Sequence, residues 1–288
     1  MAKLIDGKAI ALKIRAKLAQ DVARLRAAGG VVPGLAVVRV GEDPGSKIYV
    51  AAKRKAAKEI GLNDWEYHFD ASVTRSQLLE RIARLNEEAA VHGILVQLPL
   101  PGHLDGGEII EQILPSKDVD GFHPVNAGKL FLGRPGLRPC TPLGIMRLLE
   151  EIGFVAAGKR AVVVGRSNIV GKPMFHMLLG ADATVTVCHR KSNIEREIPQ
   201  ADLLVAAAGS PELIKGQWIK PGAVVIDVGM NRKADGKLVG DVEFLAASER
   251  AAYITPVPGG VGPMTVVMLL QNTVAAAVTA AGSNLQLK

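Results

Sequence analysis

The chain has 288 residues, a length that suits two domains better than one compact core. Apolar residues make up 48% of the chain and aromatic residues only 4%, so the core is expected to consist mainly of Ala, Val, Ile and Leu, as in α/β proteins. The formal net charge of +7 favours an anionic partner, but the sequence lacks the zinc-finger spacing, basic tail or interleaved aromatic residues that indicate nucleic-acid binding.

The cysteine spacing and the hydropathy of the chain indicate the cellular compartment in which the protein is expected. Cys140 and Cys188 lack the spacing of a metal site, so reduced thiols are expected, as in the cytoplasm. No apolar run is expected to reach the length of a membrane span. The chain starts in an amphipathic pattern that contains Asp6 and Asp21, unlike a signal or transit peptide. We therefore expect a cytoplasmic protein that binds neither membranes nor nucleic acid.

The first half of the chain alternates predicted helices with short apolar strands. Apolar residues spaced three or four apart predict a helix over 7–27, and the run 34–40 predicts a buried strand. Ser46 is the expected N-cap of a second helix, which ends at Gly61. A strand over 65–69, a helix over 74–88 and a strand over 93–98 follow. This alternation predicts a parallel sheet with helices on both faces.

The second half resumes the alternation after a long irregular stretch. Gly, Pro and Asn recur throughout 115–139, and a loop of that length is usually functional or crosses between domains. A helix over 141–151 leads to strands expected near residues 160, 183, 201, 223 and 253. Pro263 suits the first turn of a final apolar helix over 264–280.

Residues 161–173 have the form of a nucleotide-binding turn. An unbroken apolar run ends at Gly165, a short polar loop follows, and Gly171 precedes a helical pattern. A buried strand that leads into a helix in this way offers N–H groups and the positive end of the helix dipole to a phosphate. The loop departs from G-x-G-x-x-G because Ser167 replaces the second glycine. Arg166 beside it offers a permanently charged donor.

The end of the next strand distinguishes NADP from NAD. In NAD-binding sheets this place usually holds Asp or Glu, which binds the ribose 2′-hydroxyl. Here the strand is followed by His189-Arg190-Lys191. Arg190 and Lys191 alone also fit a solvated strand end. Together with Arg166 they favour a 2′-phosphate, and therefore NADP.

Several polar residues of the first half are candidates for chemistry. Tyr49 and Lys53 are four apart and project from one helix face, although the surrounding cations also fit an ordinary surface helix. Gln97 lies at the carboxyl end of a buried strand, where ligands gather in open α/β sheets. Asp118 and Asp120 lie in the long loop, where turn formation is the alternative. No third ligand has regular spacing, so no metal site is predicted.

These segments together resemble the bifunctional methylenetetrahydrofolate dehydrogenase/cyclohydrolase family of the FolD type. The resemblance covers nearly the whole chain, in the family's order. It rests on 46–55 (SKIYVAAKRK), 97–101 (QLPLP), 117–124 (KDVDGFHP), 139–142 (PCTP), 165–173 (GRSNIVGKP) and 255–265 (TPVPGGVGPMT). One departure is Arg190, where many members have serine. It changes the expected contacts to the 2′-phosphate without weakening the preference for NADP.

The resemblance implies a two-domain α/β fold, with an N-terminal α/β catalytic domain and a Rossmann-like NADP-binding domain. The folate-binding catalytic domain is expected over 1–140 plus 264–288, so that the C-terminal helix returns to it, and the NADP-binding domain over 141–263. The implied partners are NADP, tetrahydrofolate substrates including polyglutamylated forms, and a second copy of the chain, joined through the nucleotide domain. The implied role lies in one-carbon metabolism and purine biosynthesis.

The implied activity has two steps. The first oxidises 5,10-methylenetetrahydrofolate to the 5,10-methenyl form, with hydride passing to NADP⁺, and the second hydrolyses that product to 10-formyltetrahydrofolate. By resemblance, Lys53 is the general acid/base of hydrolysis and Gln97 orients it. Burial, together with Lys55 or Arg54, is expected to make Lys53 release its proton more readily. Tyr49 would pack on the folate rings, while Asp120 would bind the pterin.

The family match also supplies the remaining site positions. The implied catalytic residues are Lys53, Gln97, Tyr49 and Asp120; further substrate contacts are Leu98, Pro99, Gly260 and Pro263; and the cofactor contacts are Gly165, Arg166, Ser167, Ile169, Arg190, Ser192 and Thr141. Two alternatives stay open: an NADP dehydrogenase of another small substrate, of the shikimate type, and a basic binding protein without catalysis. Neither requires this set of catalytic residues.

Overall fold

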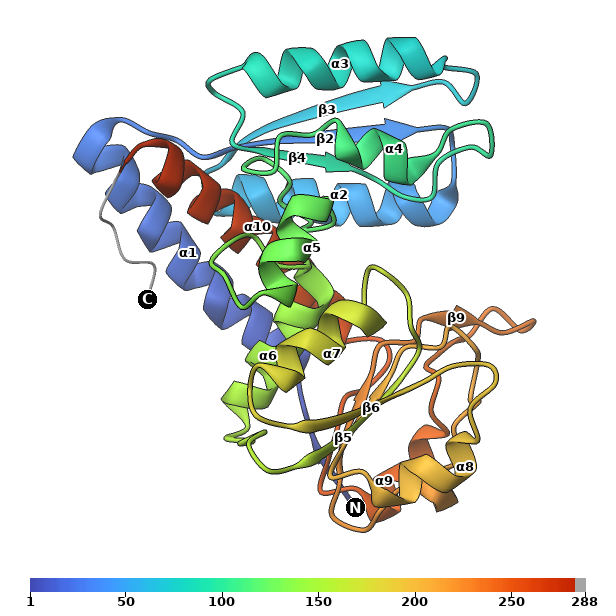
Figure 1. Ribbon diagram of the computed structural model, residues 1–288. Coiled ribbons are helices and arrows are strands. Elements are labelled where there is room, and N and C mark those ends of the chain that lie inside the picture. The colour runs from blue at the N-terminus through green and yellow to red at the C-terminus, as the bar shows by residue number, and fades with distance from the viewer. Residues whose placement is uncertain (283–288) are drawn as a thin grey trace. The chain divides into compact units, whose positions relative to one another are not determined.

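The computed structural model describes residues 1–282, which divide into two units (Figure 1). Met1–Leu12 and Thr141–Thr265 form the unit that contains a six-stranded sheet. Lys13–Cys140 and the segment from Val266 form the unit that contains a three-stranded sheet. We refer to them as the six-stranded unit and the three-stranded unit.

The six-stranded unit is built on a parallel sheet of order β1-β11-β8-β7-β5-β6. Its central strands are buried runs of Val, Leu, Ile and Ala, as expected where helices cover both faces. Its strands are β1 (Lys3–Leu4), β5 (Arg160–Val164), β6 (Thr184–Cys188), β7 (Leu203–Ala206), β8 (Val224–Asp227) and β11 (Tyr253–Ile254), with a hairpin of β9 (Asn231–Arg232) and β10 (Leu238–Val239). Its helices are α6 (Cys140–Glu151), α7 (Gly171–Leu179), α8 (Ile194–Glu197) and α9 (Phe244–Arg250), with short 3-10 turns at Ile198–Gln200 and Gly216–Trp218.

The first residues of the chain belong to this unit, which corrects the expectation that 1–140 lie together. β1 pairs in parallel with β11, and Ile5 N donates to Ile254 O at 2.9 Å. Gly7 opens α1 (Gly7–Gly29) and packs against Gly260 so closely that a Cβ at Gly7 would lie 1.9 Å from the Gly260 carbonyl oxygen. Strand pairing and this close contact therefore join 1–12 to the second half of the chain.

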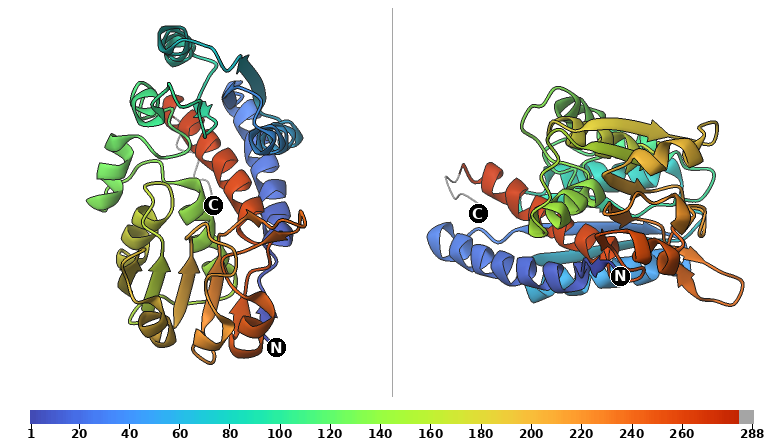
Figure 2. Two further views of the ribbon diagram at one scale, coloured as in Figure 1. Left: turned by 90° about the vertical axis from the view of Figure 1, so that its right-hand side faces the viewer. Right: turned by 90° about the horizontal axis from the view of Figure 1, so that it is seen from below.

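The three-stranded unit has a parallel sheet of order β3-β2-β4. All residues of β2 and β4 are buried, and α2 and α3 cover opposite faces of the sheet (Figure 1). α1 and α10 run side by side along this unit (Figures 1 and 2). The strands are β2 (Gly34–Val40), β3 (Asn63–Phe69) and β4 (Gly93–Val96), and the helices are α2 (Pro44–Glu59), α3 (Arg75–Glu87), α4 (Gly106–Glu111), α5 (Pro124–Phe131) and α10 (Val261–Ala280).

Two helix starts differ from the sequence predictions. Asp43, not Ser46, is the N-cap of α2: its Oδ2 accepts from Ser46 N at 2.7 Å, and Pro44 occupies the first turn. Helix α5 lies inside the stretch 115–139, which was expected to be irregular. His123 caps it, with Nδ1 accepting from Val125 N at 3.0 Å. Histidine is not a common capping residue, so residues 115–139 contain no clear signal for a helix start.

Helix α10 corrects the expectation that no apolar run reaches the length of a membrane span. This helix of 20 residues contains an 18-residue window of mean hydropathy 1.5, which is long and apolar enough by length and composition, although 72% of that window is buried inside the structure. Asn272 Nδ2 donates to the carbonyl oxygens of Val119 and Arg138, at 2.8 and 2.9 Å. Its later turns therefore pack within the three-stranded unit, as predicted for a returning C-terminal helix.

Candidate active site

Lys53 and Gln97 meet at the carboxyl end of the three-stranded sheet. Lys53 lies on α2 and is only 7% exposed, and its Nζ donates to Gln97 Oε1 at 3.0 Å. Gln97 directly follows β4, where its N donates to Val38 O at 2.9 Å and its Nε2 donates to Leu98 O at 2.7 Å. The bond from Nε2 to Leu98 O orients the Gln97 amide so that Oε1 faces the Lys53 ammonium group. Gln97 thus both stabilises and orients a buried cation.

Asp120 joins this cluster from the loop after α4. Burial raises the pKa of the Asp120 carboxyl, and the Lys53 charge opposes that increase. Asp118 has a different role: it is 1% exposed, and its Oδ2 accepts from His123 N at 2.8 Å and from Asn126 Nδ2 at 2.9 Å. Asp118 therefore holds the loop together, and Asp120 is the carboxylate that interacts with the lysine.

Cys140 is a neighbour that the sequence analysis did not assign to the site. Its Sγ donates to Val119 O at 3.2 Å, and its thiol also interacts with the Asp120 side chain. Burial raises the pKa of this thiol well above its ordinary value. Cys140 therefore stays protonated near neutral pH and acts as a hydrogen-bonding group rather than a nucleophile. The only signal for it in the sequence was its place in the segment 139–142.

Tyr49 lies one turn before Lys53 on α2, with 37% of its surface exposed. Burial of the remainder raises the pKa of its phenol. The Arg54 guanidinium pairs with Asp64 at 2.9 Å and with Glu66, so it ties α2 to β3, and its expected effect on Lys53 stays a prediction. Leu98 and Pro99 follow Gln97 and are joined by a cis peptide bond.

A second predicted group lies at the carboxyl edge of the six-stranded sheet. Gly165 has φ of 128°, and a Cβ there would lie 2.1 Å from Ala207 O. A Cβ at Gly171 would lie 2.1 Å from Gly165 O, so both positions require glycine. Ser167 Oγ accepts from Val170 N at 3.1 Å and from Gly171 N at 3.4 Å. Two of the N–H groups expected to be free for a phosphate are therefore occupied by Ser167.

Arg166 and Arg190 follow neighbouring strands at this edge. β5 and β6 pair in parallel with Val164 opposite Cys188, so each arginine lies two residues beyond the last pair. Both side chains are exposed. Ser192 Oγ accepts from His189 N at 3.0 Å and shapes the loop that carries Arg190. A glycine turn flanked by two exposed guanidinium groups fits a dinucleotide that carries a 2′-phosphate.

The other predicted positions also lie in the six-stranded unit. Gly260 is buried, and a Cβ there would lie 2.6 Å from Pro256 O. Pro263 lies in the first turn of α10, while Thr141 Oγ1 is 2.9 Å from Thr265 Oγ1. Ile169 is 43% exposed. Their ligand contacts stay predictions. Within residues 1–282, no three His, Cys, Asp or Glu side chains are grouped to hold a metal ion.

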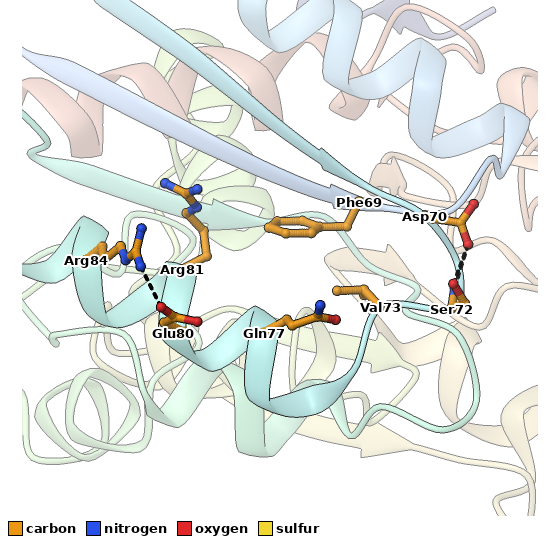
Figure 3. Close-up of a pocket in the computed structure, with 8 residues that line it drawn as sticks. All are labelled: Phe69, Asp70, Ser72, Val73, Gln77, Glu80, Arg81 and Arg84. Carbon is orange, nitrogen blue, oxygen red and sulfur yellow. Dashed lines mark hydrogen bonds and ion pairs between the residues drawn. The ribbon is translucent and has the colours of Figure 1, made fainter.

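A cavity of about 420 Å³ lies elsewhere in the three-stranded unit, between β3 and α3 (Figure 3). It contains none of the predicted site residues. Four of its polar side chains bind one another: Arg84 pairs with Glu80, and Ser72 Oγ donates to Asp70 Oδ1 at 2.7 Å. The cavity is therefore separate from the Lys53 cluster, which α2 carries on the opposite face of the sheet.

Comparison with known proteins places the chain in a family. The family model for the tetrahydrofolate dehydrogenase/cyclohydrolase catalytic domain matches residues 5–120, and the model for the NAD(P)-binding domain of the same family matches 139–281. A relative from Myxococcus xanthus (strain DK1622), Bifunctional protein FolD 2, is 66% identical over 277 residues, which are 96% of each chain. The chain belongs to the tetrahydrofolate dehydrogenase/cyclohydrolase family.

Solved structures of this family share the fold. The FolD methylenetetrahydrofolate dehydrogenase/cyclohydrolase from Campylobacter jejuni is 49% identical, with a TM-score of 0.95 over 97% of this chain and 99% of that one. The Trypanosoma brucei FolD, complexed with NADP cofactor and inhibitor, is 44% identical, with a TM-score of 0.93 over 97% of this chain and 98% of that one. These matches confirm the predicted family and the predicted two-domain α/β architecture.

Proposed function

We propose that this protein is a bifunctional folate enzyme. It oxidises 5,10-methylenetetrahydrofolate to 5,10-methenyltetrahydrofolate with NADP⁺, and it hydrolyses that product to 10-formyltetrahydrofolate. The observation that carries the proposal is the buried Lys53 ammonium group held by Gln97, with Asp120 acting on it, in a chain of this family. Relatives named as bifunctional, and a neighbour that binds NADP, support both halves of the activity.

The oxidation requires alignment more than a base. A nitrogen lone pair of the folate expels hydride from the bridging carbon and leaves a delocalised cation, and bound NADP⁺ supplies the hydride acceptor. Arg166 and Arg190 hold the 2′-phosphate. The turn between Gly165 and Gly171 lets the backbone approach the pyrophosphate. The protein's contribution to this step is therefore to bind and orient.

The hydrolysis requires proton transfer. Water adds to the methenyl carbon, and the neutral amine form of Lys53 takes one of its protons. The resulting hydroxyl loses the second proton to solvent as the formyl C=O forms, and the lysine returns the first proton to the ring nitrogen whose bond to the carbon breaks. Gln97 keeps Nζ in place throughout, Asp120 accepts hydrogen bonds from the pterin amino and ring N–H groups, and Tyr49 packs on the folate rings. Only this step depends on Lys53 as an acid and base.

The proposal extends to partners and location. The net charge of +7 suits the carboxylates of polyglutamylated folates. We propose a cytoplasmic homodimer, joined through the nucleotide domain, that has no affinity for nucleic acid or membranes and supplies formyl groups for purine biosynthesis. A shikimate-type substrate and a non-catalytic binding role have no observation in their favour in a member of this family.

A direct assay tests the activity. Pure protein is mixed with 5,10-methylenetetrahydrofolate and NADP⁺, with NAD⁺ in parallel, and NADPH and methenyl absorbance are followed separately. We expect NADPH to form with little methenyl accumulation, and added methenyltetrahydrofolate to be hydrolysed. Methenyl accumulation without hydrolysis would leave a dehydrogenase alone. No turnover by folded protein with either cofactor would refute the folate function.

A further inference from the structure

Two buried carboxylates lie at the carboxyl edge of the six-stranded sheet, outside the groups assigned above. Asp227 is the last residue of β8, and Asp241 follows the β9–β10 hairpin. They are 4% and 0% exposed. Burying a carboxylate is costly unless hydrogen bonds replace its water. Their bonding partners therefore show what these two side chains hold in place.

The Asp241 side chain binds the backbone of the loop that follows β7. Its Oδ2 accepts from Ala208 N at 2.6 Å and from Gly209 N at 3.0 Å, and its Oδ1 accepts from Ser210 N at 2.9 Å. Three consecutive backbone N–H groups thus converge on one carboxylate. Asn231 Nδ2 also donates to Oδ1, at 2.8 Å. Asp241 therefore fastens the loop after β7 to the hairpin after β8.

Asp227 holds Asp241 in turn. Its Oδ1 accepts from Asp241 N and from Gly229 N, both at 2.9 Å, and its Oδ2 accepts from Val242 N at 2.9 Å. A Cβ at Gly240 would lie 1.9 Å from Asp227 Oδ2, and one at Gly229 would lie 2.3 Å from Asp241 Oδ1. The backbone is therefore packed directly against both carboxylates, which leaves little freedom for either to move.

The loop held by Asp241 borders the glycine turn at the cofactor edge. Ala207, the residue before Ala208, donates from N to Val164 O at 2.7 Å. Its carbonyl oxygen is the atom that a Cβ at Gly165 would approach to 2.1 Å. A shift of the 208–210 loop would consequently disturb the wall against which the Gly165 turn is packed.

We propose that Asp241 is a positioning residue for NADP: its carboxylate fixes the 208–210 loop beside the Gly165 turn, so that the carboxyl edge of the sheet is preformed before the dinucleotide binds. Asp227 anchors Asp241 by its backbone. The inference rests on the proposed function in one respect, namely that NADP binds at this edge.

Asp241→Asn tests this role with nearly unchanged volume. The amide directs N–H donors at backbone N–H groups and removes a charged acceptor, so the loop loses part of its support. We expect the dissociation constant of NADP⁺, measured by titration calorimetry without folate, to rise about tenfold or more, because the loop loses hydrogen bonds to a charged group. Asp235→Asn is the matched control on the same hairpin, since that side chain is exposed, and it should leave the constant unchanged.

Two further readouts separate positioning from general damage. Hydrolysis of methenyltetrahydrofolate consumes no NADP⁺, so Asp241→Asn should change its rate far less than it changes NADP⁺ affinity. Asn231→Ala removes one contact of Asp241 and should raise the dissociation constant in the same direction, by about threefold. If Asp241→Asn does not fold, Asn231→Ala is the variant that tests the positioning role of Asp241. A constant within about twofold of wild type in the folded variants would overturn the proposal. A wild-type protein that binds no NADP⁺ would refute the proposed function instead.

Discussion

Lys53 Nζ donates to Gln97 Oε1 at 3.0 Å, across 44 residues of sequence and from a helix to the end of a strand. The bond joins α2 to β4 at the point where a parallel sheet presents its ligand-binding edge. It leaves the ammonium group buried but oriented, and it defines what each partner contributes. In the proposed mechanism Lys53 supplies the proton transfer, whereas Gln97 holds it in position.

Lys53→Met should separate the two activities. Methionine keeps the length of the side chain but cannot exchange a proton, so we expect hydrolysis of methenyltetrahydrofolate to fall by about 100-fold or more. The oxidation needs alignment rather than a base, so more of it should survive. Lys58→Met, which changes an exposed lysine on the same helix, is the matched control. Equal loss of both activities would show that this division of roles is wrong.

Gln97→Leu should weaken hydrolysis through the lysine. The variant removes the acceptor for Nζ with little change in volume, and we expect a loss of about 10-fold to 100-fold, the range that corresponds to one charged hydrogen bond. In the Lys53→Met background the same change should have little further effect on hydrolysis, because residues that act as one unit are not additive. Two losses that multiply would indicate that Gln97 acts independently of Lys53.

Arg166→Ala should raise the KM for NADP⁺ much more than the KM for NAD⁺. The guanidinium group is placed to pair with a 2′-phosphate, which NAD⁺ lacks. Arg190→Ser, which restores the residue common in the family, should have a smaller effect in the same direction. Initial rates with both cofactors measure the ratio. Equal changes for the two cofactors would mean that neither arginine recognises the 2′-phosphate.

Asp227 should make the stability of the protein depend on pH. Burial raises the pKa of Asp227 from 3.8 to about 6. The native state therefore holds its proton more tightly than the unfolded state, and the resulting stabilisation is complete below pH 3.8 and is lost as the pH rises through 6. The total loss in the free energy of unfolding is about 3 kcal/mol, because each pH unit between the unfolded-state and native-state pKa values contributes about 1.4 kcal/mol.

Urea unfolding of wild type and Asp227→Asn at pH 5 and pH 8 measures this effect. Only wild type should lose the contribution of Asp227 to the free energy of unfolding between pH 5 and pH 8. The difference in this free energy between wild type and variant should therefore change with pH. A constant difference would contradict the prediction. The charged groups around Asp227 are Asp241 and, along a neighbouring cavity of about 410 Å³, Glu212, Lys237 and Glu243.

The order of strands and helices was largely predictable, because continuous apolar runs such as 34–40 and 160–164 mark buried parallel strands. Helix α5 was not predictable from local pattern. It contains Asn126 and Gly128, which are poor helix formers. Asn126 is buried there, and its amide donates to Pro115 O and Asp118 Oδ2, so tertiary contacts support the helix.

The contact between Lys53 and Gln97 was predictable from the family resemblance, whereas contacts that only the folded chain brings together were not. Nothing local distinguishes Asp241, whose three backbone partners lie 31 to 33 positions earlier in the chain. The same limit applies to Asp118 and Asp120, which are two residues apart. Their burial and partners decide that one holds the loop and the other interacts with Lys53.

The pairing of β1 with β11 also affects how the protein is made. Lys3 lies opposite Tyr253, so the ribosome synthesises one strand 250 residues before its neighbour. At about 10 residues per second the interval is about 25 seconds. During that time the three-stranded sheet can complete its strands, while the six-stranded sheet cannot close. The nascent chain must therefore keep its first strand unpaired and soluble until most of the polypeptide has left the ribosome.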